Sequence, residues 1–230
     1  MHELILHHYD ISPYAEKIRL IMGLKQLAWR SVQIPVVMPK PDLTALTGGY
    51  RLTPVLQVGA DIYCDTKAIA RRLERDRPTP TLYPSGCAAS GRGLAFWGET
   101  LFMDAVLIGF GMRMFPPDFV ADRQKMVPGG VSEDLARALI PSKLDEIRAK
   151  VTLIEEQLAD GRTFLLGSEA SLADFAVYHP LWEGGPIASP HVLFSAGRQD
   201  SQAQSRADDR EDDSRCRTAH SYSNLPGARW

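Results

Sequence analysis

The sequence has few cysteines, and neither its cysteines nor its histidines are spaced as in a disulfide framework or a metal site. Three cysteines occur among the 230 residues, and Cys64, Cys87 and Cys216 are far apart. None of them forms a CxxC pair, so the pattern favours neither zinc binding nor dithiol chemistry. His7 and His8 are adjacent, and neighbouring strand residues point to opposite faces of a sheet. We therefore expect no metal site.

The sequence also lacks a large excess of one charge, a long apolar run and a leader sequence. The formal net charge is −2, which gives no reason to expect nucleic acid or an anionic membrane as a partner. No uninterrupted apolar run reaches the ~18 residues of a membrane-spanning helix. The start, Met1-His2-Glu3, lacks the basic residues and cleavage site of a signal peptide. These absences predict a soluble, cytoplasmic protein.

The first thirty-odd positions predict a β-α-β unit. The apolar run Glu3 to His8 is typical of a buried strand. Ser12-Pro13 is a helix start signal, because the serine hydroxyl caps free N–H groups and proline fits the first helical position. The helix is expected to run to Met22 and to end at Gly23, which tolerates a left-handed conformation. Trp29 to Ile34 then predicts a second strand.

A loop, a hairpin and a helix are expected next. The segment 35–49 is rich in proline and glycine and is expected to be a loop with about one helical turn. Pro54 to Val58 and Asp61 to Cys64 predict two short strands joined by a tight turn. Asp65-Thr66 begins a helix with Ile69 and Leu73 on its inner face. The predicted order is therefore β-α-β-loop-β-β-α.

The middle of the chain is predicted to be helical. After a linker at 78–86, an apolar helix is expected over Leu94 to Met114. A second helix is expected over Glu133 to Asp160, where Pro141 should kink or divide it. Ser171 and Asp174 form a capping signal before a last apolar helix.

The end of the chain differs in composition. From 198 to 221 the apolar side chains are alanines and one cysteine, and such a segment cannot offset its ordering entropy by burial. We therefore divide the chain into an α/β domain at 1–84, an all-α domain at 85–183 and a disordered tail at 184–230. Because the apolar pattern stops abruptly near Trp182, the tail is also consistent with a shifted reading frame.

Several short motifs occur in the order that is typical of one known family. They are Ser12-Pro13-Tyr14 through Lys17-Ile18-Arg19, Thr53-Pro54-Val55-Leu56, Asp65-Thr66 with Ile69, and Ser171 to Phe175. Over about Leu4 to Trp182, the chain resembles the glutathione transferase superfamily. The resemblance implies a thioredoxin-like N-terminal domain, an all-helical C-terminal domain and a homodimer. It also implies glutathione as co-substrate, without a metal, and conjugation of its thiolate to a small hydrophobic electrophile, or a glutathione-assisted isomerisation.

Ser12 is the candidate catalytic residue. The glutathione thiol is mostly protonated at neutral pH, so a transferase must favour the thiolate. A helix N-terminus and a hydroxyl directed at the sulfur both do so. Tyr9 remains the alternative, since some branches of the superfamily use a tyrosine near the end of the first strand. A purely structural role for Ser12 as a helix cap also remains open.

The remaining motif residues are expected to hold the other parts of glutathione. Pro54 matches the family's cis-proline, which would present the Val55 backbone to the cysteinyl part. Asp65 and Thr66 match the acid and hydroxyl that bind the γ-glutamyl end.

Two further points stay open from the sequence. Arg51 or Lys40 could bind the glycyl carboxylate, although loop cations are often simply solvated. A non-catalytic protein that keeps this fold and binds apolar ligands or a partner is the alternative function, and a product with a damaged C-terminus is another.

Overall fold

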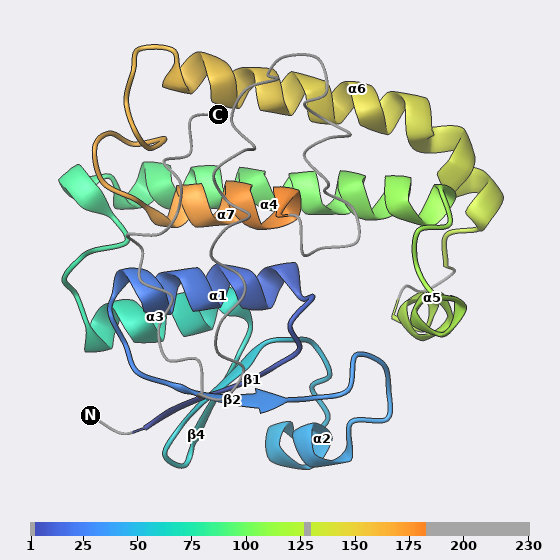
Figure 1. The fold of residues 1–230 in the computed structure, drawn as a ribbon, viewed down its shortest axis with the longest axis horizontal. Helices are drawn as coiled ribbons and strands as arrows, with labels where there is room; N and C mark the ends of the chain where they lie inside the picture. Colours follow the sequence, from blue (N-terminus) through green and yellow to red (C-terminus); the bar gives the residue numbers. More distant parts are fainter. Residues whose placement is uncertain (1–2, 127–129, 183–230) are drawn as a thin grey trace, which may run out of the picture.

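The structure is a computed structural model that describes residues 3–126 and 130–182 (Figure 1). An α/β part is followed by a helical part. The α/β elements are β1 (Leu4–His8), α1 (Pro13–Leu24), β2 (Arg30–Gln33), α2 (Pro41–Thr47), β3 (Val55–Val58), β4 (Asp61–Cys64) and α3 (Thr66–Asp76). A short 3-10 turn (Pro84–Gly86) leads to α4 (Ala88–Gly111), α5 (Pro117–Gln124), α6 (Glu133–Leu158) and α7 (Leu172–Leu181).

The four strands form one sheet in the order β2-β1-β3-β4. β1 and β2 are parallel, whereas β3 is antiparallel to both β1 and β4. α1 and α3 lie together on one side of this sheet (Figure 1). This arrangement is the thioredoxin-like fold that the resemblance implied, and the helical part that follows it is also as expected.

The core of the α/β part is continuous with the helical part. Its buried side chains come from β1, α1, β3 and α3, and include Leu6, Ile18 and Ile69. Phe175 of α7 and Ala170, which precedes α7, belong to the same cluster. Because α7 packs against α1, one core extends over both parts. At the predicted boundary between residues 84 and 85 the architecture changes from α/β to helical, but the core is not interrupted.

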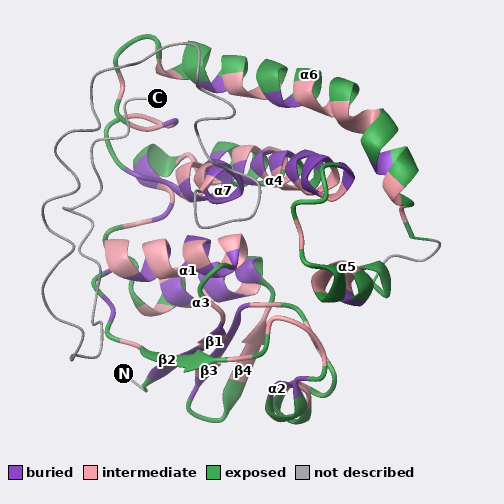
Figure 2. Ribbon diagram, turned by 45° about the vertical axis from the view of Figure 1, so that its right-hand side comes forward, coloured by how far each residue is buried: buried purple, intermediate pink, exposed green. Residues whose placement is uncertain are grey.

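The helical part is layered outward from the sheet (Figure 1). α4 and α7 lie over α1 and α3, and α6 lies outside α4. Of the side chains of α6, only Ala136, Ile147 and Ile154 are buried, and its outward face is exposed (Figure 2). The buried Asp104 of α4 pairs with two lysines of α6, Lys143 and Lys150.

Among the described residues, α4 alone is long and apolar enough to cross a membrane by length and composition. The sequence expectation considered only uninterrupted apolar runs, and α4 contains Glu99 and Asp104. α4 packs against both α6 and α7, and a buried core helix can have the same length and apolar composition as a membrane-spanning helix.

Two local expectations were wrong, and a third was correct only in part. α1 continues through Gly23 to Leu24, and Gln26, with φ of 51°, takes the left-handed conformation after it. Pro141 does not divide α6, because the apolar face that follows this proline packs on α4, although the helix bends toward its N-terminal end (Figure 1). α5 occupies a segment for which no helix was expected. The predicted disordered tail at 184–230 lies outside the described residues.

Candidate functional site

The predicted site residues all follow one edge of the sheet. His7, near the end of β1, lies opposite Val55 at the start of β3, and Val55 lies opposite Cys64 at the end of β4. β2 is parallel to β1, so it ends at the same edge. The segments 9–12, 34–40, 51–54 and 65–66 therefore meet there, although they are far apart in the sequence.

Ser12 is the N-cap of α1. Its Oγ accepts a hydrogen bond from the Ala15 N–H at 3.2 Å, and its own N–H donates to the Tyr9 carbonyl at 3.2 Å. The residue is 2% exposed. A hydroxyl that accepts one bond can still donate another. In the described part of the chain the Ser12 hydroxyl donates none, so the capping role and a role toward a bound thiol are compatible.

A second group consists of Lys40, Thr53 and Tyr9, and Tyr9 connects it to Ser12 through its carbonyl. The Lys40 Nζ donates to the Thr53 Oγ1 and to the Arg51 carbonyl, both at 3.3 Å, and lies 5.3 Å from the centre of the Tyr9 ring. Lys40 is almost fully buried. Burial, together with the charges of Arg123 and Arg51, lowers the pKa of Lys40 to about 8. Its described hydrogen bonds are all to neutral oxygens.

The Thr53–Pro54 peptide bond is cis, as the resemblance implied. Val55 lies between β1 and β4 and is fully buried, so its backbone is flanked by a strand on both sides. The backbone that precedes the proline, at Leu52 and Thr53, lies outside the strand register. Thr53 is therefore a candidate that the sequence analysis missed, because the motif alone does not show which side of the proline is free.

Asp65 and Thr66 begin α3 at the same sheet edge. Asp65 has φ of 75° and its carboxylate accepts from the Lys67 N–H at 2.7 Å. Burial, and then the charges of Glu99 and Asp65, raise the pKa of Tyr14 above its ordinary value. The charge of Asp65 thus acts on Tyr14 of α1. Thr66 is buried at the first position of the helix.

Glu99 of α4 connects the two parts of the chain close to this point. One carboxylate oxygen lies 3.4 Å from the buried Lys17 Nζ and the other 3.1 Å from the Lys67 Nζ. Burial lowers the pKa of Lys17, and the charge of Glu99 opposes that shift. This three-residue ion pair network joins α1, α3 and α4.

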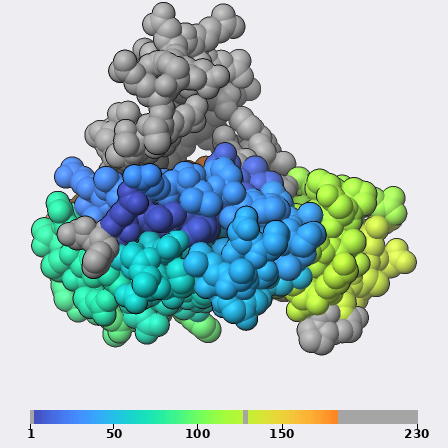
Figure 3. All heavy atoms as spheres, turned by 90° about the horizontal axis from the view of Figure 1, so that it is seen from below, coloured from blue at the N-terminus to red at the C-terminus, as the bar shows by residue number. Residues whose placement is uncertain are grey.

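Two residues of α5 reach the other side of the site. Asp122 is buried and accepts from the Arg51 Nη2 at 2.5 Å and from the Met38 N–H at 3.2 Å. Arg123 donates to the Val36 carbonyl at 2.9 Å and to the Tyr9 hydroxyl at 3.2 Å. Seen from the sheet side, the yellow-green region of α5 abuts the blue region that contains α2 (Figure 3). No local pattern in the sequence could have indicated these contacts.

Arg51 is consequently not a free cation. Its guanidinium is held by Asp122, whereas Lys40 has no carboxylate partner among the described residues. Of the two residues that the sequence offered for a carboxylate, Lys40 is the one left with an unpaired charge.

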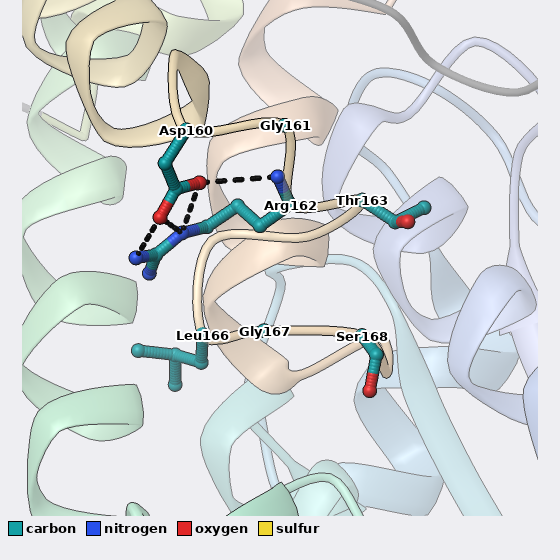
Figure 4. Close-up of a pocket in the computed structure, with 7 residues that line it drawn as sticks. All are labelled: Asp160, Gly161, Arg162, Thr163, Leu166, Gly167 and Ser168. Carbon is teal, nitrogen blue, oxygen red and sulfur yellow. Dashed lines mark hydrogen bonds and ion pairs between the residues drawn. The ribbon is translucent and has the colours of Figure 1, made fainter.

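A separate shallow pocket lies in the loop at 160–168 (Figure 4). In this pocket Arg162 forms an ion pair with Asp160, with contacts of 2.6 to 3.0 Å between the guanidinium and the carboxylate. It contains none of the predicted site residues. Within the described ranges, no group of three or more His, Cys, Asp or Glu side chains is placed to hold a metal ion.

Comparison with protein families matches both parts of the chain. Residues 6–81 match the glutathione S-transferase N-terminal domain, and residues 133–183 match the glutathione S-transferase C-terminal domain. A thioredoxin-like domain followed by a helical domain is the architecture that these two family domains form together. The chain belongs to the glutathione S-transferase superfamily.

Individual relatives agree with this family. A GST-like protein from Pseudomonas syringae is 46% identical, with a TM-score of 0.56, over 79% of this chain and 58% of that one, so this chain spans less than two thirds of that relative. FtsZ-localized protein A of Caulobacter vibrioides is 29% identical over 189 residues, which is 76% of this chain and 74% of that protein. A glutathione S-transferase from Rhodospirillum rubrum F11, 23% identical with a TM-score of 0.55, covers 77% of this chain and 76% of its own, and shares the fold.

Proposed function

We propose that the chain binds glutathione at this sheet edge and is a glutathione transferase in which the thiol is directed at the N-terminus of α1. The observation that carries the proposal is the convergence, at one sheet edge, of a helix-capping hydroxyl at Ser12, a backbone segment at Thr53 outside the strand register and a buried cation without a carboxylate partner at Lys40. Membership of the superfamily supports glutathione as the ligand.

Ser12 would act on the thiol. A free thiol has a pKa of about 8.5, so at neutral pH most of it is protonated. The helix N-terminus favours the anion, and the Ser12 O–H has a hydrogen that its bond from Ala15 leaves available. Donation of that hydrogen to the sulfur lowers the free energy of the thiolate. The thiol proton would pass to solvent, and the thiolate would attack the ring carbon of an aryl halide, so that a C–S bond forms and the halide leaves as an anion.

The other ends of glutathione have matching partners. A carboxylate suits the γ-glutamyl ammonium, so Asp65 would bind it, and Thr66 with the start of α3 would bind the γ-glutamyl carboxylate. The backbone of Thr53, which lies outside the strand register, would pair with the cysteinyl residue, whereas Val55 has a strand on both sides. Lys40 would bind the glycyl carboxylate.

The second substrate would be a small hydrophobic electrophile. Ile11 and Leu52, the neighbours of Ser12 and Thr53, are 51% and 44% exposed and lie at the same sheet edge. Exposed apolar side chains beside a nucleophile favour an apolar substrate. A homodimer in the cytoplasm is the assembly and location that we propose with this function.

The proposal is tested by glutathione binding and by turnover of an aryl halide. Wild-type protein should bind glutathione in calorimetry and conjugate 1-chloro-2,4-dinitrobenzene. Ser12→Ala should lower kcat by ~10²-fold, the effect of removing one preorganised donor, with little change in glutathione affinity. If Tyr9→Phe abolished turnover while Ser12→Ala was silent, the catalytic role would belong to Tyr9.

A non-catalytic binding protein is the second candidate. Two observations favour it: Ser12 is already engaged as a helix cap and 2% exposed, and FtsZ-localized protein A is a relative whose name records a localisation. In this case the wild-type protein would show no turnover above the uncatalysed rate, and Ser12→Ala would lower only the stability, by ~1 kcal/mol.

A further inference from the structure

α5 joins the helical part of the chain to the segment that carries Lys40. The helix lies in the connection between α4 and α6, outside both segments that match the family domains. Its hydrogen bonds and ion pairs with the α/β part are made by two adjacent side chains, Asp122, which is buried, and Arg123, which is partly exposed. The contacts converge on the segment 36–38, immediately before Pro39 and Lys40.

Asp122 uses both of its carboxylate oxygens. Oδ1 accepts from the Met38 N–H, and Oδ2 accepts from Arg51 and from Arg123. Burial would raise the pKa of Asp122, but the hydrogen bonds from Arg51 and Met38 and the charges of both arginines lower it below the ordinary value. The carboxylate therefore stays ionised, and its hydrogen bonds to charged donors are of the strong kind.

Arg123 completes the attachment. The same nitrogen, Nη2, donates to the Val36 carbonyl and to the Tyr9 hydroxyl. The backbone before Lys40 is thus held at two points, at the Val36 carbonyl and at the Met38 amide. The other acceptor of Lys40, the Arg51 carbonyl, belongs to a residue whose side chain Asp122 also holds.

We propose that Asp122 and Arg123 are positioning residues for the glutathione site: they fix the backbone that precedes Lys40 and occupy the Arg51 guanidinium, so that the buried Lys40 ammonium is presented to the glycyl carboxylate. This inference rests on the proposed binding of glutathione. Asp122 does not touch the ligand and acts through Met38 and Arg51. The helical part would thereby control glutathione affinity in the α/β part.

Asp104 provides a matched control for a purely structural role. Like Asp122 it is a buried carboxylate paired with two cations, but its partners, Lys143 and Lys150, join α4 to α6. Asp104→Asn and Asp122→Asn remove the same charge from the same kind of setting. If the two carboxylates only stabilise the fold, both variants should lose stability and neither should bind glutathione differently. If Asp122 also positions Lys40, the effect on glutathione should appear in Asp122→Asn alone.

The experiment compares Asp122→Asn, Asp104→Asn and wild type by amide hydrogen exchange and by kinetics. In Asp122→Asn, exchange in 34–40 should rise, and the KM for glutathione should rise about tenfold, as for loss of one charge-assisted hydrogen bond, with kcat nearly unchanged. Asp104→Asn should change neither. Unaltered exchange at 34–40 in Asp122→Asn, or an equal rise in Asp104→Asn, would overturn the proposal.

Two further outcomes are separable. If Asp122→Asn does not fold, Arg123→Lys keeps the charge but loses the planar fork, and it should loosen the same segment. Failure of wild-type protein to bind glutathione would overturn the proposed function, and the positioning of a glutathione-binding Lys40 with it. A loosened 34–40 segment with unchanged KM would instead overturn the positioning role alone.

Discussion

The α/β part and the helical part are stabilised in different ways. The α/β part has one continuous core in which strands and helices contribute side chains such as Leu6, Ile18 and Leu56. The helical part has two smaller clusters, around Leu101 and around Ile108, and a buried ion pair network between α4 and α6. Hydrophobic burial scales with the apolar area removed from water, so α5, whose one buried residue is Asp122, has the least of this stabilisation among the described helices.

The candidate site combines residues from both parts. Its predicted ligand-binding groups lie on the sheet edge, which the continuous core makes rigid, whereas Asp122 and Arg123 come from a short helix with little burial of its own. Segments with few buried apolar contacts open locally at low free-energy cost. The helical part is therefore suited to adjust the site, and the α/β part is suited to form it.

The largest expected effect is at Lys25. This residue is fully buried, and its Nζ donates to Glu74 at 2.6 Å and to the Arg77 and Pro80 carbonyls at 2.7 and 2.9 Å. Lys25→Met removes the donor from both carbonyls and leaves Glu74 with its bonds from the Thr81 hydroxyl and the Leu82 N–H, so the free energy of unfolding should fall by about 3 kcal/mol. Urea denaturation of the variant and the wild type measures this difference in the free energy of unfolding.

Lys143→Met in the helical part is the matched comparison. Its partner Asp104 keeps Lys150, and the Lys143 side chain is 19% exposed, so we expect a loss below about 1 kcal/mol. If both variants lost the same free energy, the contrast between the two parts would not hold.

The second prediction compares two buried histidines. The His8 Nε2 pairs with the Ser31 hydroxyl at 2.9 Å, and its Nδ1 accepts from Arg19 at 3.0 Å. Burial, and then the charge of Arg19, lowers the pKa of His8 to about 4. Because the unfolded chain binds this proton more readily, stability should fall by up to about 3 kcal/mol as the pH drops from 6.5 to 4.

His179 of α7 is also fully buried, and burial, followed by the charge of Lys17, lowers its pKa. Its Nδ1 bonds the Phe175 carbonyl, but its Nε2 has no partner among the described residues. His179→Leu should therefore cost little at pH 7, since it removes an unsatisfied group, whereas His8→Leu should cost ~1–3 kcal/mol. Chemical denaturation at several pH values measures both, and equal losses at pH 7 would contradict this prediction.

The third prediction concerns the close approach of α4 and α6. A Cβ on Gly111 would lie 2.8 Å from the Ala136 carbonyl carbon and from the Arg137 nitrogen, both of them backbone atoms. Gly111→Ala should therefore lower stability by about 1–3 kcal/mol by forcing the helices apart. Gly93→Ala, in the same helix with nothing within 4 Å, should raise it by ~0.5–1 kcal/mol. Thermal unfolding of both variants checks the pair, and a stabilised Gly111→Ala would show that the α4–α6 interface can yield.

The elements that carry the candidate site residues could be predicted from the sequence, because the signals for them are local. Ser12-Pro13, Thr53-Pro54 and Asp65-Thr66 each combine a backbone constraint with a polar side chain, and each one begins a strand or helix at the same sheet edge. What could not be predicted depends on contacts between distant residues. Asp122 meets Met38 across 84 positions and Arg51 across 71, and no spacing rule relates them.

The helix boundaries illustrate the same limit. Gly23 could end a helix, but α1 continues because Ile21 and Met22 pack in the core and Gln26 can make the turn. Pro141 could divide α6, but packing of the residues after it on α4 keeps the helix in one piece. In both places tertiary contacts outweigh a local preference of about 1–3 kcal/mol.

The smallest expected effect tests whether α5 tunes the site electrostatically. The pKa of Lys40 is about 8, lowered first by burial and then by Arg123 and Arg51. A carboxylate is bound by the charged form, so affinity for S-methylglutathione should be constant below pH 7 and fall about tenfold by pH 9. The S-methyl ligand is chosen because it has no thiol to titrate.

Lys40→Met should bind this ligand more weakly at pH 7, and its affinity should not show the fall between pH 7 and pH 9 that Lys40 causes. Subtracting the pH profile of Lys40→Met from that of the wild type removes the contribution of any group of the ligand that titrates. Arg123→Gln deletes one of the two neighbouring charges, so the midpoint for Lys40 should move to higher pH. Calorimetry across pH 6 to 10 measures all three proteins. An unchanged midpoint in Arg123→Gln would mean that α5 holds the segment before Lys40 without influencing the pKa of Lys40. A shift of the midpoint to lower pH would contradict the proximity of Arg123 and Lys40, because removal of a positive neighbour can only favour the protonated lysine.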